Sequence, residues 1–188
     1  LLGWVPVSFG TCENMTVLEY LDFYARAQHF RGQERVDRIQ DVMEFTGLAA
    51  IPERLVNQLS RGQGQRLCLG RALIHDPQVL IMDEPAAGLD PRARVELKRL
   101  IRLLAEEGKT ILISSHILSE LGEMCDTLLF IDRGRIVHHG TAESLRRSDE
   151  GFAMVEVEVA SAPEKLIEWA LFSPHVTVEE GRTSGARI

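Results

Sequence analysis

The chain has 188 residues, of which 45% are hydrophobic and 26% are charged, and its formal net charge is −7. This length and composition fit one full-sized globular domain, or one domain and part of another, and exclude a disordered or fibrous protein. The negative charge is the wrong sign for a protein that gains affinity by neutralising nucleic-acid phosphates, so nucleic acid is not an expected partner. Three widely spaced cysteines without a CxxC pair favour free thiols over disulfides or a zinc site.

The chain contains no segment that reads as a membrane anchor. No apolar run reaches the roughly 18 to 20 residues that cross a bilayer, and the first residues lack the basic stretch of a signal peptide. A role at a membrane would therefore depend on docking to another protein. Because the chain starts at Leu1 without an initiator Met, we expect a further segment upstream.

The first part of the chain is expected to form a strand and then three helices. Thr16 and Glu19 have the spacing of a capping box, Gly47 is a typical residue after a helix end, and Pro77 cannot continue a helix. The strand is expected within residues 2–7 and the helices over residues 16–28, 34–46 and from Ser60 to about residue 76.

After Pro77 the hydrophobic period changes. Short apolar runs at residues 79–82 and 110–114 predict strands of a mainly parallel sheet that is covered on both faces. The helix expected between them, at 91–107, has Pro91 in its first turn and Gly108 after its end. This strand, helix and strand order predicts an α/β core.

The last part of the chain is expected to contain a hairpin and then a separate small unit. The hairpin is expected over residues 126–139, with Thr141 opening a short helix after it. A polar linker at 146–151 precedes the unit, whose expected elements are a strand at 154–159, a helix at 163–171 and a strand at 176–178.

The segment Leu59-Ser60-Arg61-Gly62-Gln63 places a capping serine and unpaired backbone N–H groups at a helix start. These donors and the positive end of the helix dipole favour an anion. Arg61 could add a charge-assisted contact to a phosphate or could point to solvent. An ordinary capped helix would explain this segment by itself, so its interpretation depends on the motifs that follow.

A second motif is an apolar strand that ends in two carboxylates. Asp83 and Glu84 place costly charge where ligands bind in open α/β folds, at the carboxyl edge of the sheet. By themselves, such carboxylates more often mark the start of a loop or a helix cap. Pro85 and the downstream segment Gly88-Leu89-Asp90-Pro91 favour a functional interpretation.

These motifs, followed by Ser114-Ser115-His116, stand in the order found in the ATP-binding-cassette (ABC) ATPases, and the resemblance covers about residues 2–145. It implies an α/β fold, a P-loop NTPase-like core with a mainly parallel sheet and an inserted helical subdomain. The domains expected from it are a partial nucleotide-binding domain over 1–147, with the helical subdomain at about 12–75 and the catalytic core at about 76–147, and a linker with a partial α+β accessory piece over 148–188.

The resemblance also implies ATP and Mg²⁺ as ligands and a role for each site residue. It implies that Asp83 holds Mg²⁺ through water, that Glu84 acts as general base or polarises the attacking water, and that His116 contacts the terminal phosphate. In the signature motif the family has LSGGQ, so Arg61 stands in place of a glycine. The residues expected to bind nucleotide are Ser60, Arg61, Gly62 and Gln63, which face the opposite subunit's phosphate, and Asp90, which links the two sites and could also cap the next helix.

Two further departures from the family pattern limit the expected activity. The phosphate-cradling Walker A loop, GxxxxGK[ST], and the aromatic residue that stacks on adenine are absent from these residues and are expected upstream. The 188 residues alone are therefore expected to be inactive. Val7 occupies the position of the Q-loop glutamine, so activity or coupling could be impaired.

The leading hypothesis is the ATP-hydrolysing subunit of an exporter-type ABC transporter. It implies a separate transmembrane permease, a second ATPase subunit and a peripheral location on the cytoplasmic face of the cell membrane. A non-transport ABC ATPase is disfavoured because the short stretch between Val7 and Leu59 has no coiled-coil heptads. A catalytically impaired or regulatory module is supported by Val7 and the missing loop, and opposed by Asp83, Glu84 and His116.

Overall fold

The computed structural model describes residues 2–7, 14–141, 144, 156–157, 180–182 and 185–187. The chain divides into two compact units, Leu1–Leu128 and Leu129–Ile188. The helix expected at 163–171 and the strand expected at 176–178 lie outside the described residues, as does most of the short helix expected after Thr141.

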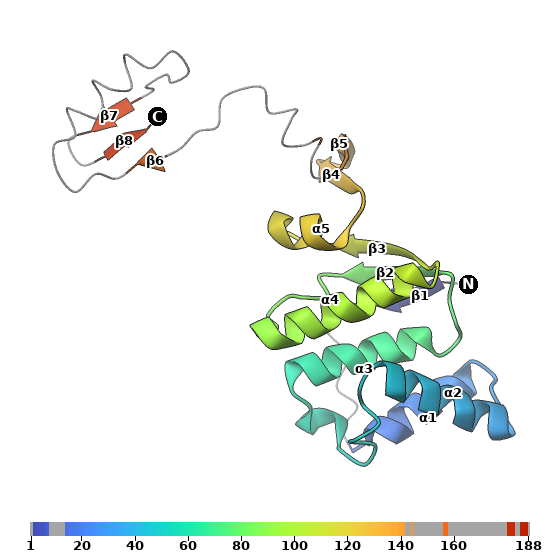
Figure 1. The fold of residues 1–188 in the computed structure, drawn as a ribbon. Coiled ribbons are helices and arrows are strands. Elements are labelled where there is room, and N and C mark those ends of the chain that lie inside the picture. The colour runs from blue at the N-terminus through green and yellow to red at the C-terminus, as the bar shows by residue number, and fades with distance from the viewer. Residues whose placement is uncertain are drawn as a thin grey trace. The chain divides into compact units, whose positions relative to one another are not determined.

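The first unit contains a three-stranded parallel sheet. Its strands are β1 (Leu2–Val5), β2 (Val79–Asp83) and β3 (Thr110–Ser114), in the order β1-β2-β3. The register places Asp83 opposite Ser114, so the carboxyl ends of β2 and β3 meet at one edge. The predicted α/β core with a parallel sheet is confirmed (Figure 1).

The strands do not have the two covered faces that their apolar runs suggested. Val5, Leu80 and Met82 are buried, whereas Trp4 and Leu112 on the other face are 48% and 53% exposed. This alternation is that of strands half-covered by one layer of helices. Within the described residues, α3 (Arg61–Leu73) contacts β1 and α4 (Pro91–Glu106) contacts β3. The expectation of two covered faces is therefore wrong for this part of the chain.

Three helices follow β1, as predicted. The first, α1 (Val17–Ala27), starts with the predicted capping box: the Thr16 N–H donates to Glu19 Oε2 at 2.8 Å, and the Glu19 N–H donates to Thr16 Oγ1 at 3.2 Å. The second, α2 (Gly32–Phe45), starts two residues before the expected Glu34. A short 3-10 helix, η1 (Val56–Gln58), then leads to α3.

Helix α3 is the central helix of the first unit. Figure 1 shows it between α4 on one side and the pair α1 and α2 on the other, and all three contact it. At Gly70, a Cβ atom would lie only 3.0 Å from Val42 Cγ1 of α2, so a glycine permits this close approach. The buried residues of α3 are Gly64, Gln65, Leu67, Cys68, Leu69, Gly70, Ala72 and Leu73.

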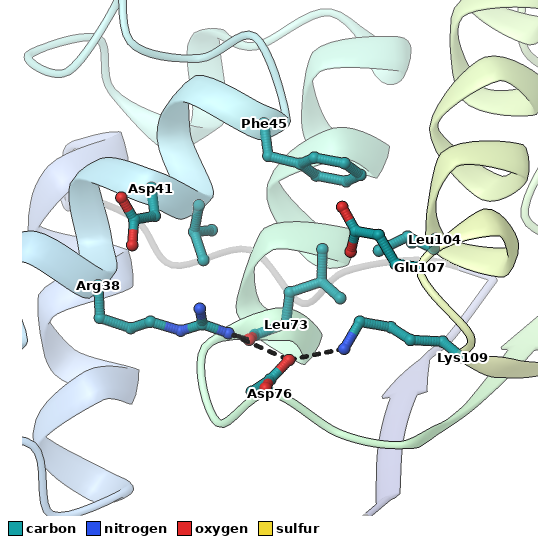
Figure 2. A pocket seen from close by; sticks show the side chains of 9 residues that line it. Arg38, Asp41, Phe45, Leu73, Asp76, Leu104, Glu107 and Lys109 are labelled. Atoms are coloured by element: carbon teal, nitrogen blue, oxygen red, sulfur yellow. Dashed lines mark hydrogen bonds and ion pairs between the residues drawn. The ribbon is translucent and has the colours of Figure 1, made fainter.

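A charged cluster joins the helices to the start of the sheet (Figure 2). Arg38 of α2 donates to the carbonyl oxygens of Leu73 (2.6 Å) and Ile74 (2.7 Å) at the end of α3. Lys109, just before β3, donates to Asp76 Oδ1 at 2.6 Å, and Arg38 lies 3.7 Å from the same oxygen. Arg38, Leu73, Asp76 and Lys109 line part of a pocket of about 230 Å³. The cluster therefore ties α2 and the end of α3 to the strand layer.

The remaining elements are shorter. Helix α5 (Leu118–Met124), which was not predicted, follows β3. Strands β4 (Leu128–Asp132) and β5 (Arg135–Gly140) form the expected hairpin, in which Arg133 and Gly134 have the positive φ angles of a two-residue hairpin turn. In the second unit, β6 (Glu156–Val157), β8 (Gly185–Arg187) and β7 (Glu180–Arg182) pair antiparallel, and β6 lies within the strand expected at 154–159.

Candidate nucleotide-binding site

The ends of β2 and β3 bring together Asp83, Glu84 and Ser114. The Ser114 hydroxyl donates to Asp83 Oδ1 at 2.6 Å and accepts from the Glu84 backbone N–H at 3.0 Å. The same N–H lies 3.2 Å from the Ser114 carbonyl oxygen. Ser114 therefore fixes both acidic residues, a role that was not predicted from the sequence. The feature of the sequence that could have predicted this role is the position of Ser114 at the end of the neighbouring parallel strand.

The Glu84 carboxylate contacts His116, which follows β3. His116 Nδ1 lies 2.9 Å from each of the two carboxylate oxygens, so a proton on Nδ1 is shared with this carboxylate. Glu84 has a φ of 45°, in the left-handed region, where the chain turns away from the strand. Its side chain is 25% exposed, against 72% for His116. The pair thus combines an oriented, half-buried carboxylate with an imidazole open to solvent.

The predicted signature segment lies at the start of α3. The Ser60 hydroxyl accepts from the Gln63 N–H at 3.3 Å, and Gln63 Oε1 accepts from the Ser60 N–H at 3.0 Å, which makes a second capping box. This leaves the N–H groups of Arg61 and Gly62 without an intrahelical acceptor, as is usual in a first turn. The positive end of α3 therefore offers these two donors to an anion.

Asp90 caps α4, because its Oδ1 accepts from the Ala93 N–H at 2.9 Å. The starts of α3 and α4 are packed together: a Cβ atom at Gly62 would lie 2.7 Å from Ala93 Cβ. One turn further along, Arg66 Nη1 of α3 lies 3.1 Å from Glu96 Oε2 of α4. The structure therefore brings Asp90 next to the signature segment within one chain.

The predicted site residues thus form two groups. One contains Asp83, Glu84 and His116, and the other contains the signature segment and Asp90. No hydrogen bond or ion pair joins the two groups in the part of the chain that the structure describes. Each group therefore presents its own polar surface.

Val7, at the position of the Q-loop glutamine, follows β1 and is 40% exposed. The strand before it is tied to the helices by Arg71 of α3, which lies 3.5 Å from the Trp4 carbonyl oxygen and 3.3 Å from the Tyr20 hydroxyl. The Arg71 guanidinium also lies 5.3 Å from the centre of the Tyr24 ring. Burial is the main cause of the raised pKa of Tyr20, so this hydroxyl stays neutral and accepts from Arg71.

The acidic residues suit a cation that is shared with a phosphate ligand. Mg²⁺ usually takes only one or two protein carboxylates and fills its other positions with water and phosphate oxygens. Asp83 fits this requirement, because its half-buried carboxylate is oriented by Ser114 at the sheet edge. Among the described residues there is no group of three or more His, Cys, Asp and Glu side chains that could hold a metal by itself.

The helices of the described residues include none that is both long and apolar enough to cross a membrane.

Comparisons with known proteins agree with the fold. A family model described as ABC transporter matches residues 2–87. The chain is 34% identical to the probable multidrug ABC transporter ATP-binding protein YbhF of Escherichia coli (strain K12) over 188 residues, which make up 100% of this chain and 32% of that protein. It is also 34% identical to the Nod factor export ATP-binding protein I of Rhizobium sp. (strain N33) over 175 residues, which make up 93% of this chain and 57% of that protein.

A solved structure, that of cbiO1 from Clostridium perfringens, part of the ABC transporter complex cbiONQ, is similar with a TM-score of 0.68 and 27% sequence identity. The match covers 79% of this chain and 60% of that one. The fold and these matches define an ABC transporter ATP-binding domain, and the family model covers residues 2–87 of it. The chain spans between about a third and three fifths of the length of these relatives.

Proposed function

We propose that the full-length protein hydrolyses ATP with Mg²⁺ and thereby powers the movement of a substrate through a separate membrane permease. The contact of Glu84 with His116 at the ends of two parallel strands, beside Asp83, carries this proposal. In this proposal Glu84 is the base, Asp83 the cation ligand and His116 the phosphate-binding imidazole, at the edge where ligands bind in open α/β sheets. The match of residues 2–87 to the ABC transporter family model supports the same reaction.

In this proposal each residue at the sheet edge has one role. Asp83 would hold Mg²⁺, which when bound would neutralise charge on the phosphates. Glu84 accepts a proton from the attacking water or polarises it, with its carboxylate oriented by His116 and its backbone N–H held by Ser114. His116, the more exposed partner, contacts the terminal phosphate.

The signature segment serves a second subunit. The N–H groups of Arg61 and Gly62 and the Ser60 and Gln63 groups contact the phosphate held by the partner ATPase subunit. Asp90, which lies beside them, connects the two sites of the dimer. The lack of any hydrogen bond between the two groups of site residues in the described part of the chain is compatible with such a division between subunits.

The partner in the membrane is proposed to be a permease on a separate chain, with this subunit on the cytoplasmic face. The name of one relative, a Nod factor export protein, favours export. We also propose that the nucleotide-binding domain ends at residue 147 and that the linker begins at residue 148. We further propose that the 188 residues alone do not turn over ATP, because they contain no Walker A loop.

One observation favours a second candidate, a catalytically impaired or regulatory ABC module. Val7 stands where the family has a glutamine that helps to place Mg²⁺ and water, and valine has no polar group for this task. The intact contacts of Asp83, Glu84 and His116 favour the active enzyme.

The two candidates differ in the release of inorganic phosphate from ATP by the purified full-length protein. The ATPase proposal predicts Mg²⁺-dependent release that rises when the protein is reconstituted with its permease in lipid vesicles. Absence of release in both conditions would support the regulatory module. Release that does not respond to the permease would overturn the coupling to transport while leaving the ATPase activity in place.

A further inference from the structure

The side chain of Arg61 lies over the backbone of Gly88, in the turn before α4. A Cβ atom at Gly88 would lie 2.5 Å from both Cζ and Nη1 of Arg61 and 2.9 Å from its Nη2. Gly88 also has a φ of 66°, which residues with a Cβ atom rarely adopt. The guanidinium therefore occupies the space that any other residue at position 88 would need.

This contact is packing between a planar cation and a peptide backbone. Within the described part of the chain, no hydrogen bond or ion pair holds the Arg61 guanidinium. A guanidinium is flat and weakly hydrated, so it covers a backbone surface more readily than an ammonium group does. A glycine at position 61, as in the family's LSGGQ pattern, would leave the surface of Gly88 uncovered.

The covered turn lies between the two groups of site residues. On one side, the Ala87 N–H donates to the Glu84 carbonyl oxygen at 3.0 Å. On the other side, Asp90 caps α4 two residues after Gly88. The base of Arg61 is itself fixed, because the next residue, Gly62, packs against α4. A contact at Gly88 can therefore set the position of both neighbours.

We propose that Arg61 is a positioning residue that holds the turn of residues 84–90 against the start of α3. It thereby sets Glu84 and Asp90 relative to the signature segment. The contact between Arg61 and Gly88 is seen in the structure, whereas its effect on turnover rests on the proposed ATPase function. Position 61 then controls how rigidly the hydrolytic group and the signature segment of one subunit are connected.

The kinetic test uses the full-length protein with four single variants. Arg61→Ala should lower kcat about tenfold with little change in the KM for MgATP, because misplacement of a catalytic group acts on the chemical step. Arg61→Lys should restore part of the loss, since its stem covers part of the turn. Arg99→Ala is the matched control, because Arg99 is an exposed arginine of α4. It should behave as the wild type does.

The fourth variant, Gly88→Ala, displaces the guanidinium from the same surface. In the Arg61→Ala background it should therefore lower kcat by a smaller factor than it does in the wild type. Equal factors in the two backgrounds would overturn the proposal. So would an Arg61→Ala effect confined to KM, which would assign Arg61 to phosphate binding alone.

A second measurement needs no nucleotide. The amides of Ala87 and Leu89 donate to carbonyl oxygens within the turn, at 3.0 and 3.2 Å, and their hydrogen exchange reports its opening. Arg61→Ala should speed this exchange severalfold and Arg99→Ala should not. Unchanged exchange in Arg61→Ala would contradict the proposal. If the wild type hydrolyses no ATP, the proposed function fails, and the exchange experiment still decides the role of Arg61.

Discussion

His116 Nδ1 lies 2.9 Å from both carboxylate oxygens of Glu84, although the two residues follow different strands. The parallel pairing of β2 with β3 produces this contact, because it ends both strands at the same edge. Ser114 adds a second restraint on the backbone of Glu84. The proposed base is therefore held at its side chain and at its backbone before any ligand binds.

Replacing His116 with alanine should lower kcat by about a hundredfold or more, because the carboxylate loses its orienting partner and the phosphate loses a contact. Steady-state release of phosphate by the full-length protein measures this effect. His139→Ala, at an exposed position of β5, is the control and should retain wild-type turnover. A His116→Ala protein that is as active as the wild type would remove His116 from the site.

Ser60 and Thr16 each cap a helix, so their alanine variants can be compared as a matched pair. Ser60→Ala and Thr16→Ala each remove a capping box and should each lower the free energy of unfolding by about 1 kcal/mol in urea titrations. Only Ser60→Ala should also reduce ATP turnover, because α3 carries the signature segment and α1 does not. Equal losses of turnover in both variants would indicate a purely structural role for Ser60.

Gly62→Ala should destabilise the protein by about 1–3 kcal/mol, because the new methyl group would meet Ala93 Cβ. Ala93→Gly makes room for it, at a helix-propensity cost of about 1 kcal/mol. In the double variant, the loss of unfolding free energy should therefore be smaller than the sum of the two single losses. Additive losses would show that α3 and α4 are not packed together at this point.

A pH-dependent contribution to stability is expected from Asp76. The hydrogen bond from Lys109, followed by the charges of Lys109 and Arg38, lowers the pKa of Asp76 in the folded state. The resulting stabilisation is fully present above the unfolded pKa of about 3.9 and is lost as the pH falls through the lower, folded-state value.

Asp76→Asn should therefore reduce the free energy of unfolding at pH 7 by at most about 1 kcal/mol, since the Asp76 side chain is 64% exposed and its charge is screened by solvent. The difference from the wild type should persist at pH 5 and shrink below about pH 4. Asp41→Asn, in the same pocket, is the control and should have little effect at any pH. A difference that does not depend on pH would contradict the assignment to the ion pair.

The local features of this fold could be predicted from the sequence because they depend on neighbouring residues. The capping box at Thr16 was predicted from Glu19 three residues later, and the box at Ser60 has the same spacing to Gln63. Helix α5 was missed because it has only seven residues, too few for a clear period. The exposed face of the sheet was also missed, because an apolar run does not show which neighbours cover it.

In the candidate site too, local features could be predicted from the sequence and contacts between distant segments could not. The sequence placed Asp83 and Glu84 at a strand end, and their position at the sheet edge follows from the parallel order. It could not show that Ser114 bonds to Asp83 or that Arg61 covers Gly88, because both are contacts between distant segments. The catalytic and nucleotide-binding roles of the site residues stay predictions.

The central claim is that Glu84 promotes attack on ATP, and the full-length Glu84→Gln variant tests it most directly. Glutamine preserves the size of the side chain but removes its charge and its ability to accept a proton. We predict that kcat for ATP falls about a hundred- to ten-thousand-fold, while MgATP still binds with an affinity close to that of the wild type. A Glu84→Gln protein that hydrolyses ATP at the wild-type rate would contradict the account.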